Sequence, residues 1–165
     1  MIKSRKNQLT SKVGEYLVCA ELCRRGLIST TFTGNIPDID ILTINDHLKL
    51  EPIQVKTISS GQWQYRSAEE FLSIQISGNI QTIKERTPLE NPDLIWVFVF
   101  LRGEYSQDEF YICRMKEVQD IIERKYTKFL KDKGGKRPKN PASTHGVISR
   151  EDLKDYKDKW ETIIK

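Results

Sequence analysis

Two aspartates, a glutamine and a lysine stand at spacings that suit metal-dependent chemistry. Asp38 and Asp40 come directly before an apolar run, and Gln54 and Lys56 lie in the next apolar run along the chain. Side chains two residues apart on a β-strand point to the same face. An antiparallel hairpin would therefore bring the two pairs together at one polar site on the edge of a sheet.

An earlier segment supplies a helix. Apolar residues recur there at spacings of three and four, which predicts one helical stripe. The stripe consists of Leu9, Val13, Tyr16, Leu17, Ala20, Cys23 and Leu27. Thr10 or Ser11 is expected to cap this helix and Gly26 to end it.

Glu15 is unusual within that helix. At about 100° per residue it falls on a second apolar flank, with Val18, Cys19 and Leu22, and away from the charged side chains. A buried carboxylate needs a charged partner or a metal. The alternative is an exposed glutamate in the first turn, where the helix dipole favours a negative charge.

Acids on a helix and at a strand start, with an amide and a lysine on the next strand, suggest one kind of chemistry. Carboxylate and amide oxygens are suitable ligands for a hard divalent cation such as Mg²⁺. A neighbouring ammonium can orient an attacking water or stabilise charge that develops on a phosphate. The combination is typical of phosphodiester hydrolysis.

Three motifs carry a resemblance to a known family. The stretches "GEYLVCAELCRRGL", "PDIDIL" and "IQVKT", in this order and spacing, resemble the PD-(D/E)XK nuclease superfamily, which includes restriction endonucleases and Holliday junction resolvases. The resemblance spans residues 11–57. It implies a restriction endonuclease-like core and a magnesium-dependent endonuclease, with Mg²⁺ or Mn²⁺ as the cofactor and DNA as the partner.

The resemblance also implies roles for single residues. Glu15 matches the family's helix acid, Asp40 the main metal ligand and Lys56 the family's lysine. Asp38 supplies the Asp of the Pro-Asp pair in the motif. It either contacts the metal ligands without binding the metal itself or only forms a turn. Asp40 is favoured over Asp38, because resolvase-like members have an apolar run directly after this aspartate.

Gln54 departs from the family pattern. It stands where the family most often has Glu or Asp, so it could still coordinate the cation through its amide oxygen but would add no charge. Gln variants of this motif occur in active members, including an intron-encoded homing endonuclease. Glu51 is a poor substitute because it faces the other side of its strand. The alternative function is therefore a catalytically degenerate DNA-binding or protein-interaction module with the same fold.

Contacts to DNA are expected from other segments. The candidates are Lys12, Gln62, Trp63, Arg66, Lys136 and Arg137. Residues 61–66, "GQWQYR", can stack on bases or grip phosphates, and residues 131–139, "KDKGGKRPK", form a basic loop. For Trp63, packing of the ring on the sheet is an equally good alternative. For the basic segments, the equal alternative is a solvated surface that binds no DNA.

The remaining elements follow from composition and periodicity. Strands are expected in "LISTTF", "IDILTI", "LKLEPIQVKT", "LIWVFVFL" and "EFYICR", with a hairpin between the second and third and another between residues 61–66 and 71–77. Helices are expected at residues 116–130 and 149–164. The sequence therefore predicts a mixed α/β (α+β) fold, with a central mixed β-sheet flanked by helices.

Composition limits the class of protein. The chain has 165 residues, of which 38% are hydrophobic and 30% charged, and this indicates a single folded domain over residues 1–165, with core motifs at 11–57 and C-terminal helices and a basic loop at 115–165. The net charge of +4 suits a polyanionic partner. The longest apolar run, residues 94–101, is too short for a membrane span, so an intracellular, cytoplasmic protein is expected.

Two further expectations concern cysteines and assembly. Cys19, Cys23 and Cys113 are expected to be core thiols, because with only two histidines a Cys/His metal site has little support. A homodimer is expected, because one active site cuts one strand and a symmetric pair cuts both.

Overall fold

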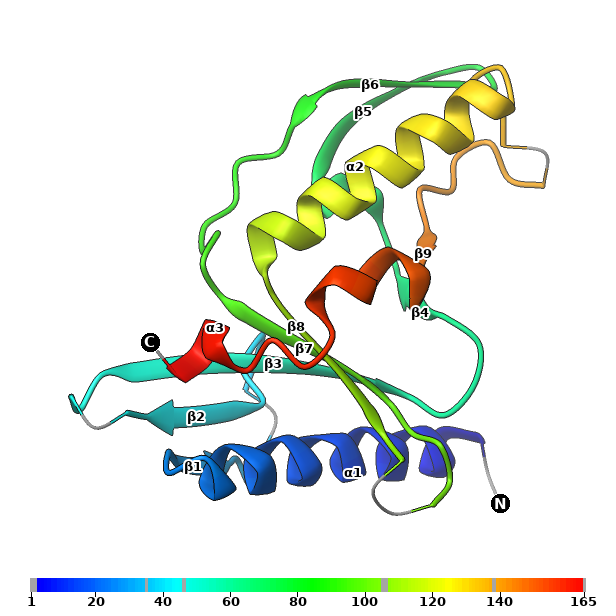
Figure 1. The fold of residues 1–165 in the computed structure, drawn as a ribbon. Coiled ribbons are helices and arrows are strands. Elements are labelled where there is room, and N and C mark those ends of the chain that lie inside the picture. The colour runs from blue at the N-terminus through cyan, green and yellow to red at the C-terminus, as the bar shows by residue number, and fades with distance from the viewer. Residues whose placement is uncertain (1–2, 35, 46, 105–106, 138, 165) are drawn as a thin grey trace. The chain divides into compact units, whose positions relative to one another are not determined.

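The structure is a computed structural model that describes residues 3–34, 36–45, 47–104, 107–137 and 139–164. The chain divides into two compact units, which are described separately (Figure 1). Unit 1 consists of residues 1–61, 93–114 and 153–165. Unit 2 consists of residues 62–92 and 115–152.

Unit 1 contains a five-stranded mixed sheet with the order β1-β2-β3-β7-β8. The strands are β1 (Ile28–Thr31), β2 (Ile41–Ile44), β3 (Leu50–Ile58), β7 (Ile95–Phe100) and β8 (Glu109–Arg114). β3 and β7 are parallel, and the other neighbouring pairs are antiparallel. The five predicted strands and the mixed α/β class are confirmed.

Helix α1 (Lys3–Arg24) packs on β1, β2 and β3, but with a different face from the predicted stripe. Val18 and Leu22 on the second flank are fully buried, whereas Leu9, Val13 and Tyr16 are exposed, Tyr16 by 60%. The helix therefore buries the flank that contains Glu15. Periodicity finds both apolar flanks, and it is the close approach of Gly14 to the sheet that selects one of them.

The ends of α1 show one correction and one confirmation. The helix begins at Lys3, so Thr10 and Ser11 are not its cap, and the basic N-terminal segment is helical. It ends at Arg24, followed by Gly26 with a φ of 90°. The N–H of Leu27 donates to the carbonyl of Leu22 at 3.1 Å, which closes the last turn.

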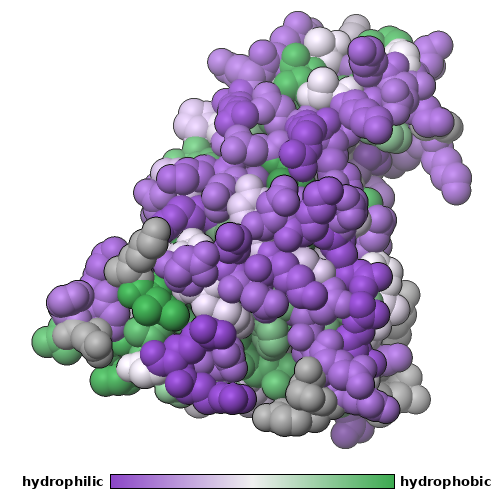
Figure 2. All heavy atoms as spheres, in the orientation of Figure 1, coloured by the Kyte–Doolittle hydropathy of each residue, from purple (hydrophilic) through white to green (hydrophobic). Residues whose placement is uncertain are grey.

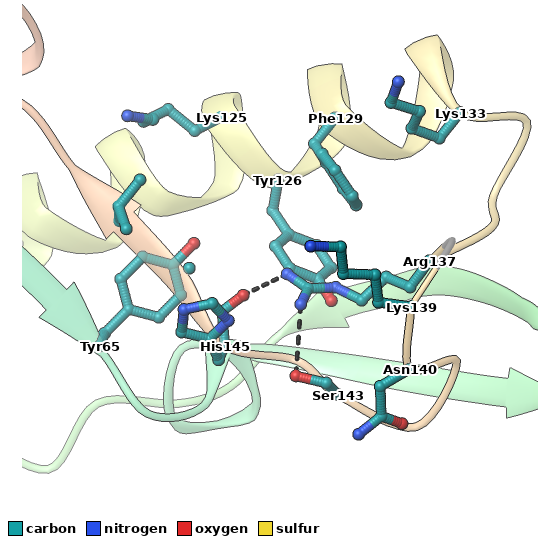
Figure 3. Close-up of a pocket in the computed structure, with 12 residues that line it drawn as sticks. Tyr65, Lys125, Tyr126, Phe129, Lys133, Arg137, Lys139, Asn140, Ser143 and His145 are labelled. Atoms are coloured by element: carbon teal, nitrogen blue, oxygen red, sulfur yellow. Dashed lines mark hydrogen bonds between the residues drawn. The ribbon is translucent and has the colours of Figure 1, made fainter.

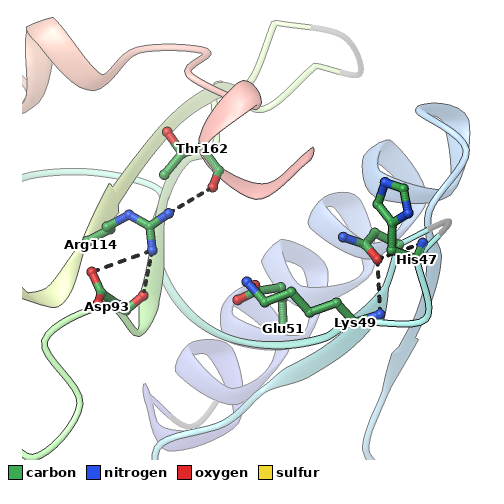
Figure 4. A network of polar contacts seen from close by, with 7 residues as sticks. His47, Lys49, Glu51, Asp93, Arg114 and Thr162 are labelled. Carbon is green, nitrogen blue, oxygen red and sulfur yellow. Dashed lines mark hydrogen bonds and ion pairs between the residues drawn. The ribbon is translucent and has the colours of Figure 1, made fainter. Parts of the chain in front are cut away.

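The predicted hairpin between β2 and β3 is confirmed. Ile41 pairs with Ile53 in an antiparallel register. In its turn, the side-chain oxygen of Asn45 accepts hydrogen bonds from the N–H groups of His47 and Lys49, each at 3.0 Å (Figure 4). The amide side chain thus adds to the backbone hydrogen bonds of this turn, which join Asn45 to Leu48 and Lys49.

The C-terminal segment forms two short elements in place of the one predicted helix. A 3-10 helix, η2 (Glu151–Tyr156), is followed by α3 (Glu161–Ile164). Asp158 between them has a φ of 55°, which ends the first helix. Arg114 contacts Asp93 and donates to the carbonyl of Thr162, so α3 is tied to β8 (Figure 4).

The core of unit 1 joins the sheet to its helices. Its buried members come from α1, from four strands and from the C-terminal segment. They are Val18, Leu22, Leu27, Ile41, Ile53, Val55, Ile95, Val97, Val99, Ile112, Trp160 and Ile163. The apolar side chains of β3 in this set have odd numbers, which places Gln54 and Lys56 on the other face of that strand.

Unit 2 contains helix α2 (Met115–Asp132), which confirms the predicted helix, and two two-stranded sheets. β4 (Trp63–Tyr65) pairs with β9 (Gly146–Ile148), and β5 (Leu72–Ser77) pairs with β6 (Ile80–Arg86). A short 3-10 helix, η1 (Ala68–Glu70), lies between β4 and β5. The predicted hairpin between residues 61–66 and 71–77 is therefore wrong, because each strand has a different partner.

Surface and thiol positions complete the description. None of the described helices is both long and apolar enough to cross a membrane. Figure 2 shows mostly hydrophilic residues on the face that it displays. Cys113 is buried as predicted, Cys19 is half-buried and Cys23 is exposed, so the prediction of core thiols is wrong for Cys23.

Candidate active site

Asp40 lies directly before β2 and is bonded to β3 on both its backbone and its side chain. Its N–H donates to the carbonyl of Ile53 at 2.9 Å, and its Oδ2 accepts from the N–H of Val55 at 2.7 Å. Asp40 is a bend residue directly before Ile41, the first residue of β2, and Ile41 pairs with Ile53. The two hydrogen bonds therefore hold Asp40 against residues 53–55, the part of β3 that contains Gln54.

Gln54 and Lys56 share one face of β3 with the neighbouring strand β7. Gln54 is 9% exposed and pairs in register with Trp96. The Nζ of Lys56 lies 5.1 Å from the centre of the Trp96 ring, a cation–π distance that helps to fix the direction of the side chain. Glu51, on the opposite face, forms an ion pair with Lys49.

Glu15 is buried, as the second-flank position predicts. It is 6% exposed, and its carboxylate is 2.6 Å from the Nζ of Lys12. It lies well beyond the first turn of α1, so the alternative of a first-turn glutamate does not hold. The buried charge therefore has the partner that its desolvation requires.

Lys12 connects the helix acid to Asp40. The hydrogen bond to Glu15 raises the pKa of Lys12, and the negative charges of Glu15 and Asp40 act in the same direction. The direct contact of Lys12 is with Glu15, at 2.6 Å. The sequence analysis expects Lys12 to contact DNA, whereas in the structure its ammonium is paired with Glu15.

Gly14 allows α1 to carry Glu15 this close to the sheet. A Cβ at Gly14 would lie 1.8 Å from Oγ1 of Thr57 and 2.8 Å from that residue's Cβ and Cγ2. No side chain fits in that space, so the helix backbone rests on β3 at this point. The glycine before the acid is therefore part of the site's construction.

The donor set fits a hard divalent cation. Asp40, Glu15 and Gln54 offer two carboxylates and an amide oxygen, which are ligands that Mg²⁺ accepts. Among the described residues no three Asp, Glu, His or Cys side chains gather as a metal site. Asp40 binds Val55 through Oδ2, which leaves Oδ1 for a ligand.

Asp38 lies outside this group. It is exposed, and its φ of 62° marks a turn before β2. Aspartate tolerates this left-handed conformation better than most residues. The position agrees with the turn alternative for Asp38.

The predicted DNA contacts of unit 2 differ in their accessibility. Gln62, Arg66 and Lys136 are exposed. Trp63 is 4% exposed and belongs to β4, so its ring packs inside the unit and cannot stack on a base without rearrangement. The guanidinium of Arg137 lies over the ring of Phe129 at 5.1 Å.

Two neighbours of the site were not found from the sequence. Trp96 lies in an apolar run that predicts a core strand, and only the pairing of β7 with β3 puts it beside Lys56. Thr57 directly follows the lysine, but its contact with Gly14 depends on how α1 sits on the sheet. A glycine inside a predicted helix was the one local signal of close packing.

Comparison with known proteins defines the class of fold. No family model and no curated protein matches this sequence. Among solved structures, the chain is similar to a bacterial homing endonuclease, I-Ssp6803I, with a TM-score of 0.51 and 12% identity over 95% of this chain and 92% of that chain. The chain therefore has a nuclease-like fold.

Proposed function

We propose that this protein is a metal-dependent endonuclease of the PD-(D/E)XK type that hydrolyses DNA phosphodiester bonds. The observation that carries the proposal is the hydrogen bond from the N–H of Val55 to Asp40, which holds this acid against β3, the strand that carries Gln54 and Lys56. The fold shared with a homing endonuclease supports the same conclusion.

In this proposal Asp40, Gln54 and Glu15 hold Mg²⁺ or Mn²⁺ through their oxygens. The bound cation would supply a positive charge at the phosphate and would lower the pKa of a bound water. Asp40 is fixed for this role by its two hydrogen bonds to β3. Glu15 is held by Lys12 on the buried face of α1.

Lys56 acts beside these ligands. Its ammonium donates hydrogen bonds to the attacking water or to a phosphate oxygen, and it stabilises the charge that develops there. Trp96 supports this role because its ring lies under the ammonium at 5.1 Å.

The test is cleavage of supercoiled plasmid and of a branched DNA in Mg²⁺, Mn²⁺ or EDTA. Asp40→Ala and Lys56→Ala are each expected to lower the cleavage rate by about 100-fold or more, because both remove charge stabilisation at the reacting phosphate. Glu51→Ala and Lys49→Ala, an acid and a lysine on the same hairpin, are the matched controls and should cut normally.

One specific observation favours a second function. Gln54 has an amide at the position where the PD-(D/E)XK superfamily, which this sequence resembles, usually has an acid. In that case the chain is a DNA-binding or protein-interaction module without catalysis. DNA binding that survives both EDTA and Lys56→Ala, with no cutting of any DNA form, would favour this module and overturn the nuclease.

The proposed enzyme cuts both strands as a homodimer. Two copies would supply the two sites that a double-strand cut requires. Light scattering of the purified chain, alone and with DNA, measures the oligomeric state. If the chain is a monomer in both conditions, it has one active site and would cut only one strand each time it binds, which would contradict the proposed dimer.

A further inference from the structure

Unit 2 contains a cavity of about 570 Å³ that the proposed nuclease chemistry does not use (Figure 3). It lies between α2, β4 and the segment that follows α2. This volume is within the range of about 300–1,000 Å³ that is typical of small-ligand pockets. Most of the residues that line it are aromatic, basic or polar, together with Gly146 and Val147, and none of the described lining residues is acidic.

Aromatic rings form one part of the wall. The phenol of Tyr65 packs on Gly146, where a Cβ would lie 2.0 Å from the Tyr65 oxygen. Burial raises the pKa of Tyr65 to about 12, so the phenol keeps its proton at neutral pH and can donate it in a hydrogen bond. Tyr126 donates its own proton to Oε1 of Gln81 at 2.5 Å, which leaves its ring as the part near the cavity.

Arg137 forms a second part of the wall as a fixed, flat cation. Its guanidinium lies over the rings of Phe129 at 5.1 Å and Tyr126 at 5.7 Å. Nη1 donates to Oγ of Ser143 at 3.2 Å, and Nη2 donates to the carbonyl of His145 (Figure 3). A guanidinium held in this way offers a plane on which a nucleobase can stack.

Two lysines supply charge that no carboxylate of the lining balances. Lys133 and Lys139 line the cavity and are exposed. Lys125 also lines it, but this ammonium is paired with Asp152. The positive charge near the cavity therefore comes from Lys133, Lys139 and Arg137, and it calls for an anionic ligand.

We propose that this cavity binds one nucleotide, with the base against the aromatic and guanidinium surfaces and the phosphate at Lys133 and Lys139. Stacking on an aromatic ring contributes about 1–3 kcal/mol per base, and lysine binds phosphate as a point charge. The nucleotide is either free in solution or an unpaired residue of a DNA strand. The site lies within unit 2 and does not depend on the metal site.

The experiment uses the full chain in EDTA, so that cleavage plays no part. Calorimetry measures binding of 5′-AMP, adenosine and inorganic phosphate, and fluorescence anisotropy compares a DNA duplex that has one unpaired adenine with the fully paired duplex. 5′-AMP is expected to bind at least about 10-fold more tightly than adenosine or phosphate, because only it offers both groups.

The key variant is Lys133→Ala/Lys139→Ala, and its matched control is Lys128→Ala/Lys131→Ala. The control removes the same charge at exposed positions of α2 that do not line the cavity. The cavity variant should weaken 5′-AMP binding at least about 10-fold, and the control less than about twofold, with unchanged thermal melting in both. Exposed lysines are chosen because their loss does not open the core.

Each outcome decides the proposal. A preference of about 10-fold or more for the unpaired adenine, lost in the cavity variant, would assign the site to a nucleotide within DNA. Binding of 5′-AMP without that preference would assign it to a free nucleotide. Binding of neither probe, or equal loss in the cavity and control variants, would overturn it, and this result would leave the cleavage test unaffected.

Discussion

At the scale of single residues, the candidate site balances its charges without a metal. Glu15 and Asp40 supply two carboxylates, and Lys12 and Lys56 supply two ammonium groups. Gln54, on β3 with Lys56, is buried and has an amide that adds no charge. A nearly buried glutamate is thus stable in the folded chain, and the cation has to compete with Lys12 for it.

Restoring the missing acid tests this balance. Gln54→Glu is expected to lower the Mg²⁺ concentration for half-maximal cleavage by about 10-fold, because a third carboxylate strengthens the metal site. In EDTA the same variant should melt at a lower temperature than the wild type, since it adds a negative charge beside Asp40. Cleavage and thermal melting, each followed over a Mg²⁺ titration, measure the two effects.

Gln64→Glu is the control, since Gln64 is exposed and lies in β4 of unit 2. It should change neither the metal requirement nor the melting temperature. If Gln54→Glu melts equally in EDTA and Mg²⁺ and needs as much metal as the wild type, Gln54 does not contact a cation.

The candidate residues can be picked out from the sequence because their signals are local, and their roles stay a prediction. Asp40 before an apolar run, and Gln54 two residues from Lys56, are patterns within single segments. Lys12 as the partner of Glu15 follows from a spacing of three on a helix, and this pairing was missed because the basic N-terminal segment had been assigned to DNA. Trp96 depends on strand pairing, which no local pattern encodes.

At the scale of elements, the site depends on how closely α1 lies on β3. Gly14 and Thr57 meet with no room for a further carbon atom. Glu15 is the next residue on the helix, and Lys56 is the residue before Thr57 on the strand. This close contact therefore fixes how near the part of α1 that carries Glu15 comes to β3.

Gly14→Ala tests this contact, because the contact decides whether the substitution stabilises or destabilises the folded chain. In an ordinary helix interior this change stabilises by about 0.5–1 kcal/mol. Here it is expected to destabilise by about 1–3 kcal/mol, because the new Cβ collides with Thr57. Urea unfolding measures the stability, and the cleavage rate should fall as Glu15 moves away.

Gly34→Ala is the matched control, since a Cβ at Gly34 would meet open space. Thr57→Ala removes Oγ1 and Cγ2, so it should recover part of the stability lost in Gly14→Ala. A Gly14→Ala variant as stable and as active as the wild type would show that α1 can move away from β3 with no loss of stability or activity.

Element types were easier to predict than element partners. Composition identified the strands of unit 1, and helix periodicity identified α2. Residues 61–66 and 71–77 were expected to pair because they are neighbours, yet β4 pairs with β9, about 80 residues further along the chain. Such distant pairing depends on tertiary packing, and the segments themselves carry no sign of it.

At the scale of the whole molecule, the chain places its two candidate sites in different compact units. The metal-site residues all lie in unit 1, and the cavity lies in unit 2. The backbone passes between the units four times, so unit 2 is not one continuous stretch. No change of composition along the sequence marks such a division, and the expectation of one domain stays a prediction.

DNA binding by the whole chain should depend strongly on salt. The net charge is +4, with basic side chains in both units. At higher salt the release of counterions from the DNA gains less entropy, so binding becomes weaker. If about four phosphates are neutralised, a fourfold increase in salt concentration should weaken binding about 100-fold. Anisotropy titrations in EDTA at several salt concentrations measure the slope.

Sucrose, an uncharged solute, is the control for general solvent effects and should leave the affinity nearly unchanged. An affinity that does not respond to salt would contradict a phosphate-driven contact. It would also favour the interpretation of the fold as a protein-interaction module.

The contact between Gly14 and Thr57 has a consequence for how the protein can evolve. A side chain can be accepted at position 14 only if position 57 becomes smaller at the same time, because the two share one small space. Related sequences should therefore show the two positions varying together, although 43 residues separate them in the chain. Such a correlated pair would show that related chains keep the close approach of α1 to β3.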